Sequence, residues 1–308
     1  MIKTVKKIIS YIMVCVLFLS MCIPCEAAQT STATASDANA TTGFPQITST
    51  SAIIMDAQSG QIIYEKNSHT RQYPASITKI MTAYLAIKNG DLNSTITMSD
   101  AAVWGIDRNS SHIALDVGEE ISMSDALYAV MLMSANEAAW AIAEQVSGSL
   151  ENFVQLMNDT AQSLGCKDTH FTNANGLHDP DHYTTAYDMA LITKEALTSK
   201  TFREYASETY HEIPPTNMNN ETRYLTQGNR MMLSNSEYYY PACQGGKTGY
   251  TDDAGGTLVV WAEKNDMQLI CVTMGAPDNA TNYTDSIALF NYCLLYTSPS
   301  PRDRSLSR

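Results

Sequence analysis

A serine and a lysine stand three residues apart in the stretch PASITKIM, as Ser76 and Lys79. Three positions along an α-helix bring two side chains onto one face, separated by about one turn. A hydroxyl and an amine placed in this way can exchange a proton, which acyl transfer requires. Taken alone the pattern is common, and a helix-capping serine followed by a solvated lysine explains it more simply.

Two further short motifs change this interpretation. Ser134-Ala135-Asn136 interrupts two apolar helical stretches, and Lys247-Thr248-Gly249 follows two glycines. Each alone has a plain structural explanation, a helix cap or polar kink for the first and a glycine-rich hairpin for the second. Each of the three motifs occurs only once in the chain, however, and their order is that of the penicillin-recognising serine acyltransferases.

The resemblance extends beyond the motifs. The blocks YPASITKIMTAYLAI, MLMSANEAAWAIAE, FTNANGLHDPDHYTTAYDMA and GGKTGYTDDAGGTLV are similar to blocks of the low-molecular-mass D-alanyl-D-alanine carboxypeptidases. The similarity covers residues 51–292. It implies an α+β fold of the β-lactamase and transpeptidase type, in which helices flank an antiparallel sheet and the site lies between the sheet and an all-helical subdomain.

Chemistry gives the first four motif residues distinct roles. A serine hydroxyl is too weakly acidic to attack an amide unaided, so Ser76 as the nucleophile requires a positioned base. Lys79 accepts its proton only when neutral, although an exposed lysine has a pKa of about 10.4. Burial between helices and the like charge of Lys247 would both lower that pKa. We expect Ser134 to relay a proton to the departing amine, and Asn136 to hold a catalytic side chain and the substrate's peptide oxygen.

The last motif and the residue after it are expected to bind the substrate. By the resemblance, Lys247 and Thr248 recognise the terminal carboxylate. Gly249 lets the substrate backbone lie close to the strand. We expect the backbone N–H groups of Ser76 and Tyr250 to hold the oxyanion of the tetrahedral intermediate, where one such donor is typically worth about 2.7 to 4 kcal/mol.

The hydrophobic pattern predicts the elements that position these residues. Apolar residues at helical spacing follow Ser76, and a second helical signal over residues 123–146 breaks at the Ser-x-Asn motif. Strands at both ends of the folded part with helices between them indicate a sheet that combines distant parts of the chain. Further helices are expected over residues 150–164, 186–197 and 284–292, and strands over residues 52–55, 61–64, 257–262 and 268–274.

The two ends of the chain differ in composition from the rest. Residues 1–28 have the layout of a secretory signal peptide, with lysines before an apolar run and small residues after it, and an uncleaved membrane anchor is the alternative. Residues 29–50 are small and polar, which predicts a flexible spacer before a catalytic domain at residues 51–292. CLLYTSPSPRD resembles one reading frame of a transposon-type sequencing adapter. We therefore expect residues 293–308 to be an artefact and the native C-terminal domain to be missing.

Charge and motif content argue against several kinds of partner. The net charge is −13 over 308 residues, and such an acidic chain does not bind nucleic acid or anionic membranes through its own charge. HDPDH, at residues 178–182, has the look of a metal cluster, but Pro180 breaks the helix that would align its histidines. We therefore expect no metal and no cofactor. The sequence Gly-x-Ser-x-Gly, the nucleophile elbow of α/β-hydrolases, is absent.

These observations predict an exported serine D-Ala-D-Ala carboxypeptidase. The enzyme would remove the terminal D-alanine of a peptidoglycan stem peptide through an acyl-enzyme on Ser76, and β-lactam antibiotics would inhibit it by acylating the same serine. It would act at the outer face of the cytoplasmic membrane, in the cell wall or outside the cell, anchored to the membrane only through a C-terminal segment absent from this chain. The alternatives are a D-alanyl-D-alanine endopeptidase, a serine β-lactamase, and a penicillin-sensing or wall-binding module.

Overall fold

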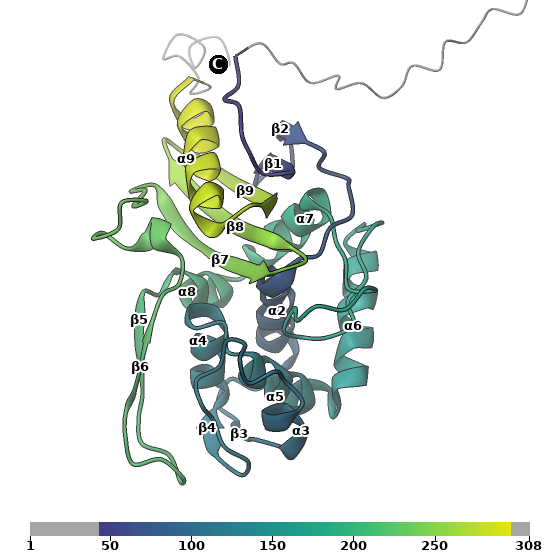
Figure 1. Ribbon diagram of the computed structural model, residues 1–308, viewed down its shortest axis with the longest axis vertical. Helices are drawn as coiled ribbons and strands as arrows, with labels where there is room; N and C mark the ends of the chain where they lie inside the picture. Colours follow the sequence, from purple (N-terminus) through teal and green to yellow (C-terminus); the bar gives the residue numbers. More distant parts are fainter. Residues whose placement is uncertain (1–42, 297–308) are drawn as a thin grey trace, which may run out of the picture. The chain divides into compact units, whose positions relative to one another are not determined.

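A five-stranded antiparallel sheet forms the centre of the fold. The structure, a computed structural model, describes residues 43–296. The predicted signal peptide, and most of the predicted spacer and C-terminal tail, lie outside these residues. The sheet has the strand order β2-β1-β9-β8-β7 (Figure 1). Its strands are β1 (Ser51–Asp56), β2 (Ile62–Lys66), β7 (Cys243–Thr251), β8 (Gly255–Lys264) and β9 (Met267–Ala276).

Strands from opposite ends of the domain pair in the sheet, as the sequence predicts. β1 and β9 are antiparallel neighbours, with Ile53 opposite Val272. Successive side chains of a strand point to opposite faces, yet Ile53 and Ile54 are both fully buried. Both faces of the sheet must therefore be covered.

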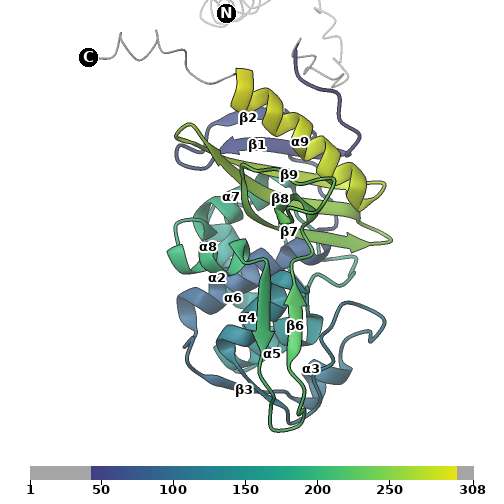
Figure 2. The ribbon, with the colours of Figure 1, turned by 90° about the vertical axis from the view of Figure 1, so that its left-hand side faces the viewer.

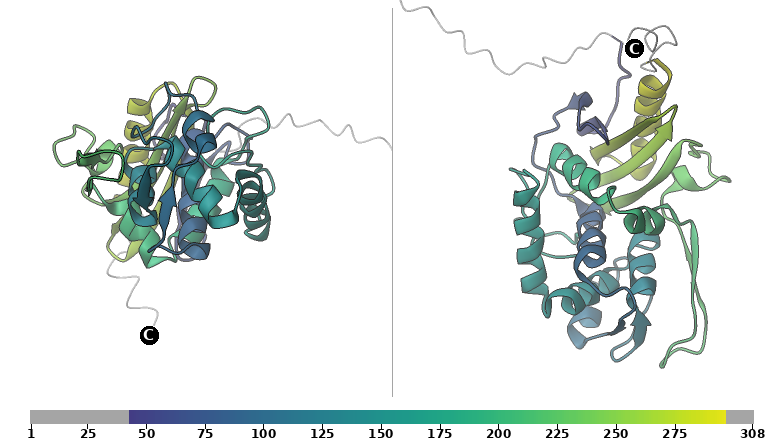
Figure 3. Two further views of the ribbon diagram at one scale, coloured as in Figure 1. Left: turned by 90° about the horizontal axis from the view of Figure 1, so that it is seen from below. Right: turned by 180° about the vertical axis from the view of Figure 1, so that it is seen from behind.

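Helices provide this cover. α9 (Asn279–Tyr296) packs against β8 and β9 on one face of the sheet (Figure 3). Ile54 belongs to the hydrophobic cluster buried on this face. α7 (Ala186–Ala196) and α8 (Lys200–Ser207) pack against the opposite face, where Ile53 is buried. The sheet is thus the middle layer between two hydrophobic clusters.

The second region of the domain is mostly helical. Its central helix, α2 (Lys79–Asn89), is buried over residues 79–86. The helical break predicted within residues 123–146 separates α4 (Met123–Leu132) from α5 (Asn136–Ser147). The elements around α2 are α3 (Asp100–Trp104), α4 (Met123–Leu132), α5 (Asn136–Ser147), α6 (Leu150–Ser163) and the short strands β3 (Thr95–Thr97) and β4 (Glu120–Ser122).

A long hairpin that the hydrophobic pattern did not predict lies along the outside of the helical region. β5 (Tyr210–Ile213) pairs with β6 (Arg223–Thr226), and the hairpin runs beside α4 (Figure 2). Ile213 and Leu225 are buried on the face that points inward. The chain then returns to the sheet through the 3-10 turn η2 (Arg230–Met232).

The segment that precedes β1 is attached to α9. The backbone N–H groups of Thr48 and Ser49 donate to the carboxylate of Asp285 over 3.0 and 2.7 Å, and Ser49 Oγ donates to it over 2.7 Å. Phe44 packs against the hydrophobic cluster on the same side. Residues 43–50, the end of the predicted spacer, are therefore held against the domain.

α9 continues past the predicted end of the catalytic domain. Cys293 and Leu294, the first residues of the predicted artefact, are buried in the same cluster as Phe290. The helix ends at Tyr296. Within residues 43–296, no helix combines the length and the apolar character needed to cross a membrane.

Candidate active site

The predicted nucleophile lies in a tight turn and not in the first turn of an α-helix. Residues Ala75–Thr78 form the 3-10 turn η1, and α2 starts at Lys79. Ala75 has a φ of +51°, a left-handed conformation that costs a residue with a side chain about 1 to 2 kcal/mol. The turn leaves Ser76 half-buried, whereas Ile77 and Thr78 are buried.

A glycine packs directly against this turn. A Cβ atom on Gly176 would lie 1.9 Å from the main-chain oxygen of Ala75, and Gly176 has a φ of +82°. Both the close approach and the backbone conformation require glycine. Residues 172–182, which we call the Asn175 segment, are in this way held against the turn that carries Ser76.

Lys79 is fully buried, and its Nζ contacts three polar groups. Nζ lies 2.9 Å from Ser76 Oγ, 2.6 Å from Asn136 Oδ1 and 2.5 Å from the main-chain oxygen of Asn175. Burial lowers the pKa of Lys79 well below its ordinary value, and the charge of Lys247 lowers it further, whereas Glu137 opposes the shift. The predicted serine and lysine therefore form a hydrogen-bonded pair, and burial shifts the pKa of the amine in the direction that favours its neutral form.

His182 fixes the Asn175 segment to η1. The N–H of Thr172 donates to His182 Nδ1 over 3.0 Å, so the neutral ring carries its proton on Nε2, which lies 2.8 Å from Thr78 Oγ1. Burial lowers the pKa of His182 to about 3. The ring is therefore neutral near pH 7, and it joins the Asn175 segment to the turn η1. The described residues contain no group of three His, Cys, Asp or Glu side chains arranged to hold a metal ion.

The Ser-x-Asn motif lies in the break between α4 and α5, as predicted. Ser134 has a φ of +59°, and its hydroxyl has no hydrogen-bond partner in the described part of the chain. Asn136 is buried at the start of α5. Its Oδ1 accepts from Lys79, its Nδ2 donates to Ser110 Oγ over 2.8 Å, and its N–H donates to the oxygen of Ser111 over 2.9 Å. These bonds fix which side of the amide faces Lys79.

The Lys-Thr-Gly motif lies on β7, the edge strand next to η1. Lys247 is buried, which lowers its pKa to about 7, and its Nζ donates to the main-chain oxygen of Thr248 over 2.8 Å. A Cβ atom on Gly249 would lie 2.7 Å from the backbone nitrogen of Ser76, so the strand passes very close to that nitrogen. Tyr250 follows and is half exposed.

The structure thus brings all three motifs to one place. Asn136 contacts Lys79 directly, Gly249 approaches the Ser76 backbone, and the charge of Lys247 acts on Lys79. Ser134 lies in the break before α5, and Thr248 and Tyr250 lie on β7. Among the described hydrogen bonds, none joins these three side chains to Ser76 or Lys79.

Three contacts of the site were not predicted. Asn175 acts through its main-chain oxygen, and Ser110 lies in a loop without a hydrophobic period, so neither gives a strong sequence signal. Glu137 is fully buried, its Oε1 accepts from the N–H of Ile113 over 2.8 Å, and its Oε2 has no partner among the described atoms. A carboxylate inside the apolar run NEAAWAIA was the one signal that pointed to a buried role.

Comparison with known proteins places the chain in a family. The profile of the peptidase S11 family, described as D-alanyl-D-alanine carboxypeptidase, matches residues 36–278. The chain belongs to this family. It is 37% identical to the D-alanyl-D-alanine carboxypeptidases DacF of Bacillus subtilis (strain 168), over 73% of this chain and 57% of that protein, and DacA of Haemophilus influenzae, over 76% and 58%. The chain therefore spans less than two thirds of the length of these relatives.

Solved structures show the same fold. The Streptomyces K15 DD-transpeptidase aligns with a TM-score of 0.74 and 25% identity, over 81% of this chain and 98% of that one. A D-alanyl-D-alanine carboxypeptidase from Mycobacterium tuberculosis H37Rv aligns with a TM-score of 0.74 and 26% identity, over 84% and 94%. The predicted α+β class, with helices that flank an antiparallel sheet, is confirmed. The subdomain predicted as all-helical is mostly helical and also contains the short strand pair β3 and β4.

Proposed function

We propose that the chain carries the catalytic site of an exported serine D-Ala-D-Ala carboxypeptidase. The observation that carries the proposal is the buried Nζ of Lys79, which lies 2.9 Å from the hydroxyl of Ser76. The backbone nitrogen of Ser76 in turn lies close to Gly249 on the edge strand β7. The names of the relatives support a substrate that ends in D-alanyl-D-alanine. Peptidoglycan stem peptides have this terminus and lie outside the cytoplasmic membrane, which agrees with the signal-peptide pattern of residues 1–28.

The first step forms the acyl-enzyme. Ser76 Oγ attacks the carbonyl carbon of the penultimate D-alanine while Lys79 Nζ takes the hydroxyl proton, which requires the neutral amine. The hydrogen bond to Asn136 Oδ1 holds Nζ in place for this transfer. The backbone N–H groups of Ser76 and Tyr250 bind the oxyanion that develops on the carbonyl oxygen.

The tetrahedral intermediate then expels D-alanine. Its C–N bond breaks as the proton on Lys79 passes through the Ser134 hydroxyl to the departing amine. Lys247 and Thr248 bind the carboxylate of that D-alanine, and a bound carboxylate favours the charged form of Lys247, whose pKa burial lowers to about 7. Water finally hydrolyses the ester and restores the Ser76 hydroxyl. A β-lactam acylates Ser76 by the same attack, with the lactam C–N bond as the one that opens.

Penicillin labelling and product analysis test this proposal. We expect a fluorescent penicillin to label the purified chain covalently, and the chain to release free D-alanine from a peptide that ends in D-Ala-D-Ala. Ser76→Ala should abolish both. Labelling that survives the substitution contradicts the nucleophile assignment. Cleavage of cross-linked dimers without release of terminal D-alanine, or rapid repeated hydrolysis of nitrocefin, replaces the proposal with an endopeptidase or a β-lactamase.

A further inference from the structure

We infer that Arg223, on the hairpin β5–β6, is a positioning residue for Asn136 and Lys79. It acts through residues 107–119, which we call the Ser110 segment. The inference rests on the proposed function, because Asn136 and Lys79 belong to the proposed catalytic site. Among the described hydrogen bonds, none joins Arg223 directly to either of these side chains.

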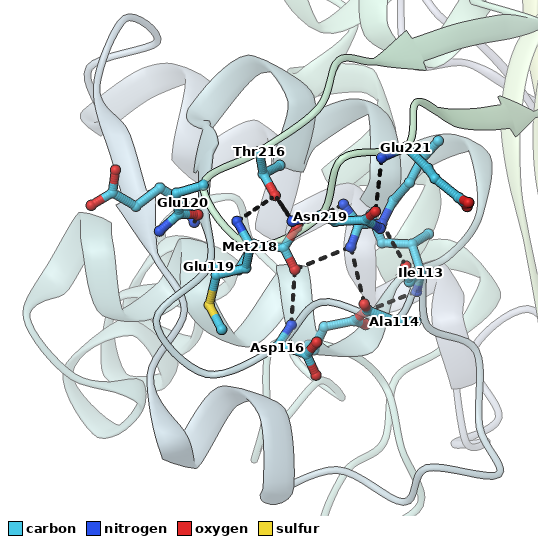
Figure 4. A network of polar contacts seen from close by, with 12 residues as sticks. Ile113, Ala114, Asp116, Glu119, Glu120, Thr216, Met218, Asn219 and Glu221 are labelled. Carbon is cyan, nitrogen blue, oxygen red and sulfur yellow. Dashed lines mark hydrogen bonds and ion pairs between the residues drawn. The ribbon is translucent and has the colours of Figure 1, made fainter.

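Arg223 forms a buried, two-pronged ion pair with the end of the Ser110 segment. Its Nη1 and Nη2 donate to the two carboxylate oxygens of Glu119 over 2.7 and 3.1 Å. The Glu119 side chain is fully buried and that of Arg223 is 11% exposed. Thr216 Oγ1 adds a third bond to Glu119 over 2.6 Å (Figure 4). A bidentate pair of this kind fixes geometry as well as charge.

The same guanidinium also holds the main chain of the Ser110 segment. Nε donates to the oxygen of Ile113 and Nη2 to the oxygen of Ala114, each over 3.1 Å. From the other side, the N–H of Ile113 donates to Glu137 on α5. Ile113 is therefore held between the hairpin and the helix that carries Asn136.

The segment reaches the proposed catalytic site a few residues earlier. Ser110 Oγ accepts from the side-chain Nδ2 of Asn136 and so orients its amide, and the main-chain oxygen of Ser111 accepts from the backbone N–H of Asn136. Asn136 Oδ1 accepts from Lys79. The path from Arg223 to Lys79 thus consists of hydrogen bonds and one short stretch of chain. Without Arg223, the buried Glu119 carboxylate would lose its counter-charge, and the segment would have to move to hydrate it.

The test compares Arg223→Gln with a matched control. Arg203→Gln removes another arginine that donates to a main-chain oxygen, that of Leu197, but has no bond to the Ser110 segment. We expect the acylation rate constant at saturating penicillin to fall about 10- to 100-fold in Arg223→Gln, the scale of a small misplacement of a catalytic group, and to stay unchanged in the control. In Arg223→Gln the acidic limb of the pH profile of acylation should also move to higher pH, because water that reaches Lys79 favours the charged amine.

A milder variant covers the case in which Arg223→Gln does not fold. Asn217→Ala removes one bond to the N–H of Glu120 and one to the oxygen of Gly118, at the exposed tip of the hairpin. We expect Asn217→Ala to lose less of the acylation rate than Arg223→Gln, and its pH profile to shift in the same direction. Wild-type rates and an unmoved profile in a folded Arg223→Gln, or in Asn217→Ala where Arg223→Gln does not fold, overturn the inference.

Amide hydrogen exchange separates a failure of the inference from a failure of the proposed function. A wild-type chain that is neither labelled nor active contradicts the proposed function alone. In that case the exchange of the Asn136 N–H, which donates to Ser111, decides the inference. Faster exchange in Arg223→Gln than in Arg203→Gln supports positioning by Arg223, and equal exchange overturns it.

Discussion

Two segments hold Lys79, and different interactions keep each of them in place. The Asn175 segment reaches Lys79 through a main-chain oxygen and is held by shape, with Gly176 against Ala75, and by the neutral ring of His182. The Ser110 segment reaches Lys79 through Asn136 and is held by the buried ion pair of Glu119 and Arg223. The attachment of the Asn175 segment thus depends on close packing, and that of the Ser110 segment depends on charge.

The difference appears in the response of the two segments to acid. The folded-state pKa of His182 is about 3 against an ordinary 6.5, so its contribution to stability is complete above pH 6.5 and is lost as the pH falls toward 3. Burial raises the pKa of Glu119, but the bonds from Arg223 and Thr216 outweigh burial, and the pKa ends below its ordinary 4.5. Its contribution is therefore present above that pH and lost only below it. Mild acid weakens the Asn175 segment first.

A substitution at Gly176 should break the packing side of this comparison most strongly. Gly165 offers a matched control, because its φ is +86° and nothing lies within 4 Å of a Cβ atom placed there. Gly165→Ala should cost only the backbone strain, about 1 to 2 kcal/mol. Gly176→Ala should cost that and a further 1 to 3 kcal/mol, roughly, for the clash with Ala75.

Urea unfolding of both glycine variants measures the difference, and penicillin acylation shows whether it reaches the site. We expect Gly176→Ala to acylate slowly and Gly165→Ala to acylate like the wild type. Equal losses of stability in the two variants would show that Gly176 is needed for its backbone conformation and not for its contact with Ala75.

His182→Gln should have a smaller effect that depends on pH. Between pH 6.5 and 3, the His182 ring is protonated in the unfolded chain and neutral in the folded one, so unfolding of the wild type takes up about one proton at this site. The free energy of unfolding therefore falls by about 1.4 kcal/mol for each unit by which the pH is lowered. The variant lacks this group, so its stability should fall less steeply over the same range. Unfolding measured at several pH values between 7 and 4 tests this, and parallel slopes would contradict the assignment of His182 as buried and neutral.

Short motifs in the sequence predicted which residues lie close together, whereas the catalytic and binding roles of these residues stay proposals. Ser76, Lys79, Asn136, Lys247 and Gly249 come together as expected, and burial and Lys247 lower the pKa of Lys79 as the residue types suggested. The turn itself was predicted as an α-helix. Ala75 and Ser134 adopt positive φ values that residues with side chains rarely adopt, so no local propensity points to them.

The supports of the site were harder to predict because they depend on contacts between distant residues. Arg223 and Ile113 lie 110 positions apart, and neither belongs to a recognisable motif. Asn175 contributes a backbone atom, which any residue type could supply. Sequence patterns of period 2 or 3.6 report which face of an element is buried, and they carry no information about which loop meets which hairpin.

The central claim is that Lys79 is neutral at the pH of the proposed reaction, and NMR titration of the lysine side chains tests this claim directly. The chain would carry isotope-labelled lysines, and the resonances lost in Lys79→Ala and in Lys247→Ala would assign the two buried amines. We predict that the Lys79 resonance titrates well below 10.5, the ordinary pKa of a lysine. A Lys79 resonance that titrates near 10.5 would contradict the account, because the amine would then be charged and unable to take the proton of Ser76.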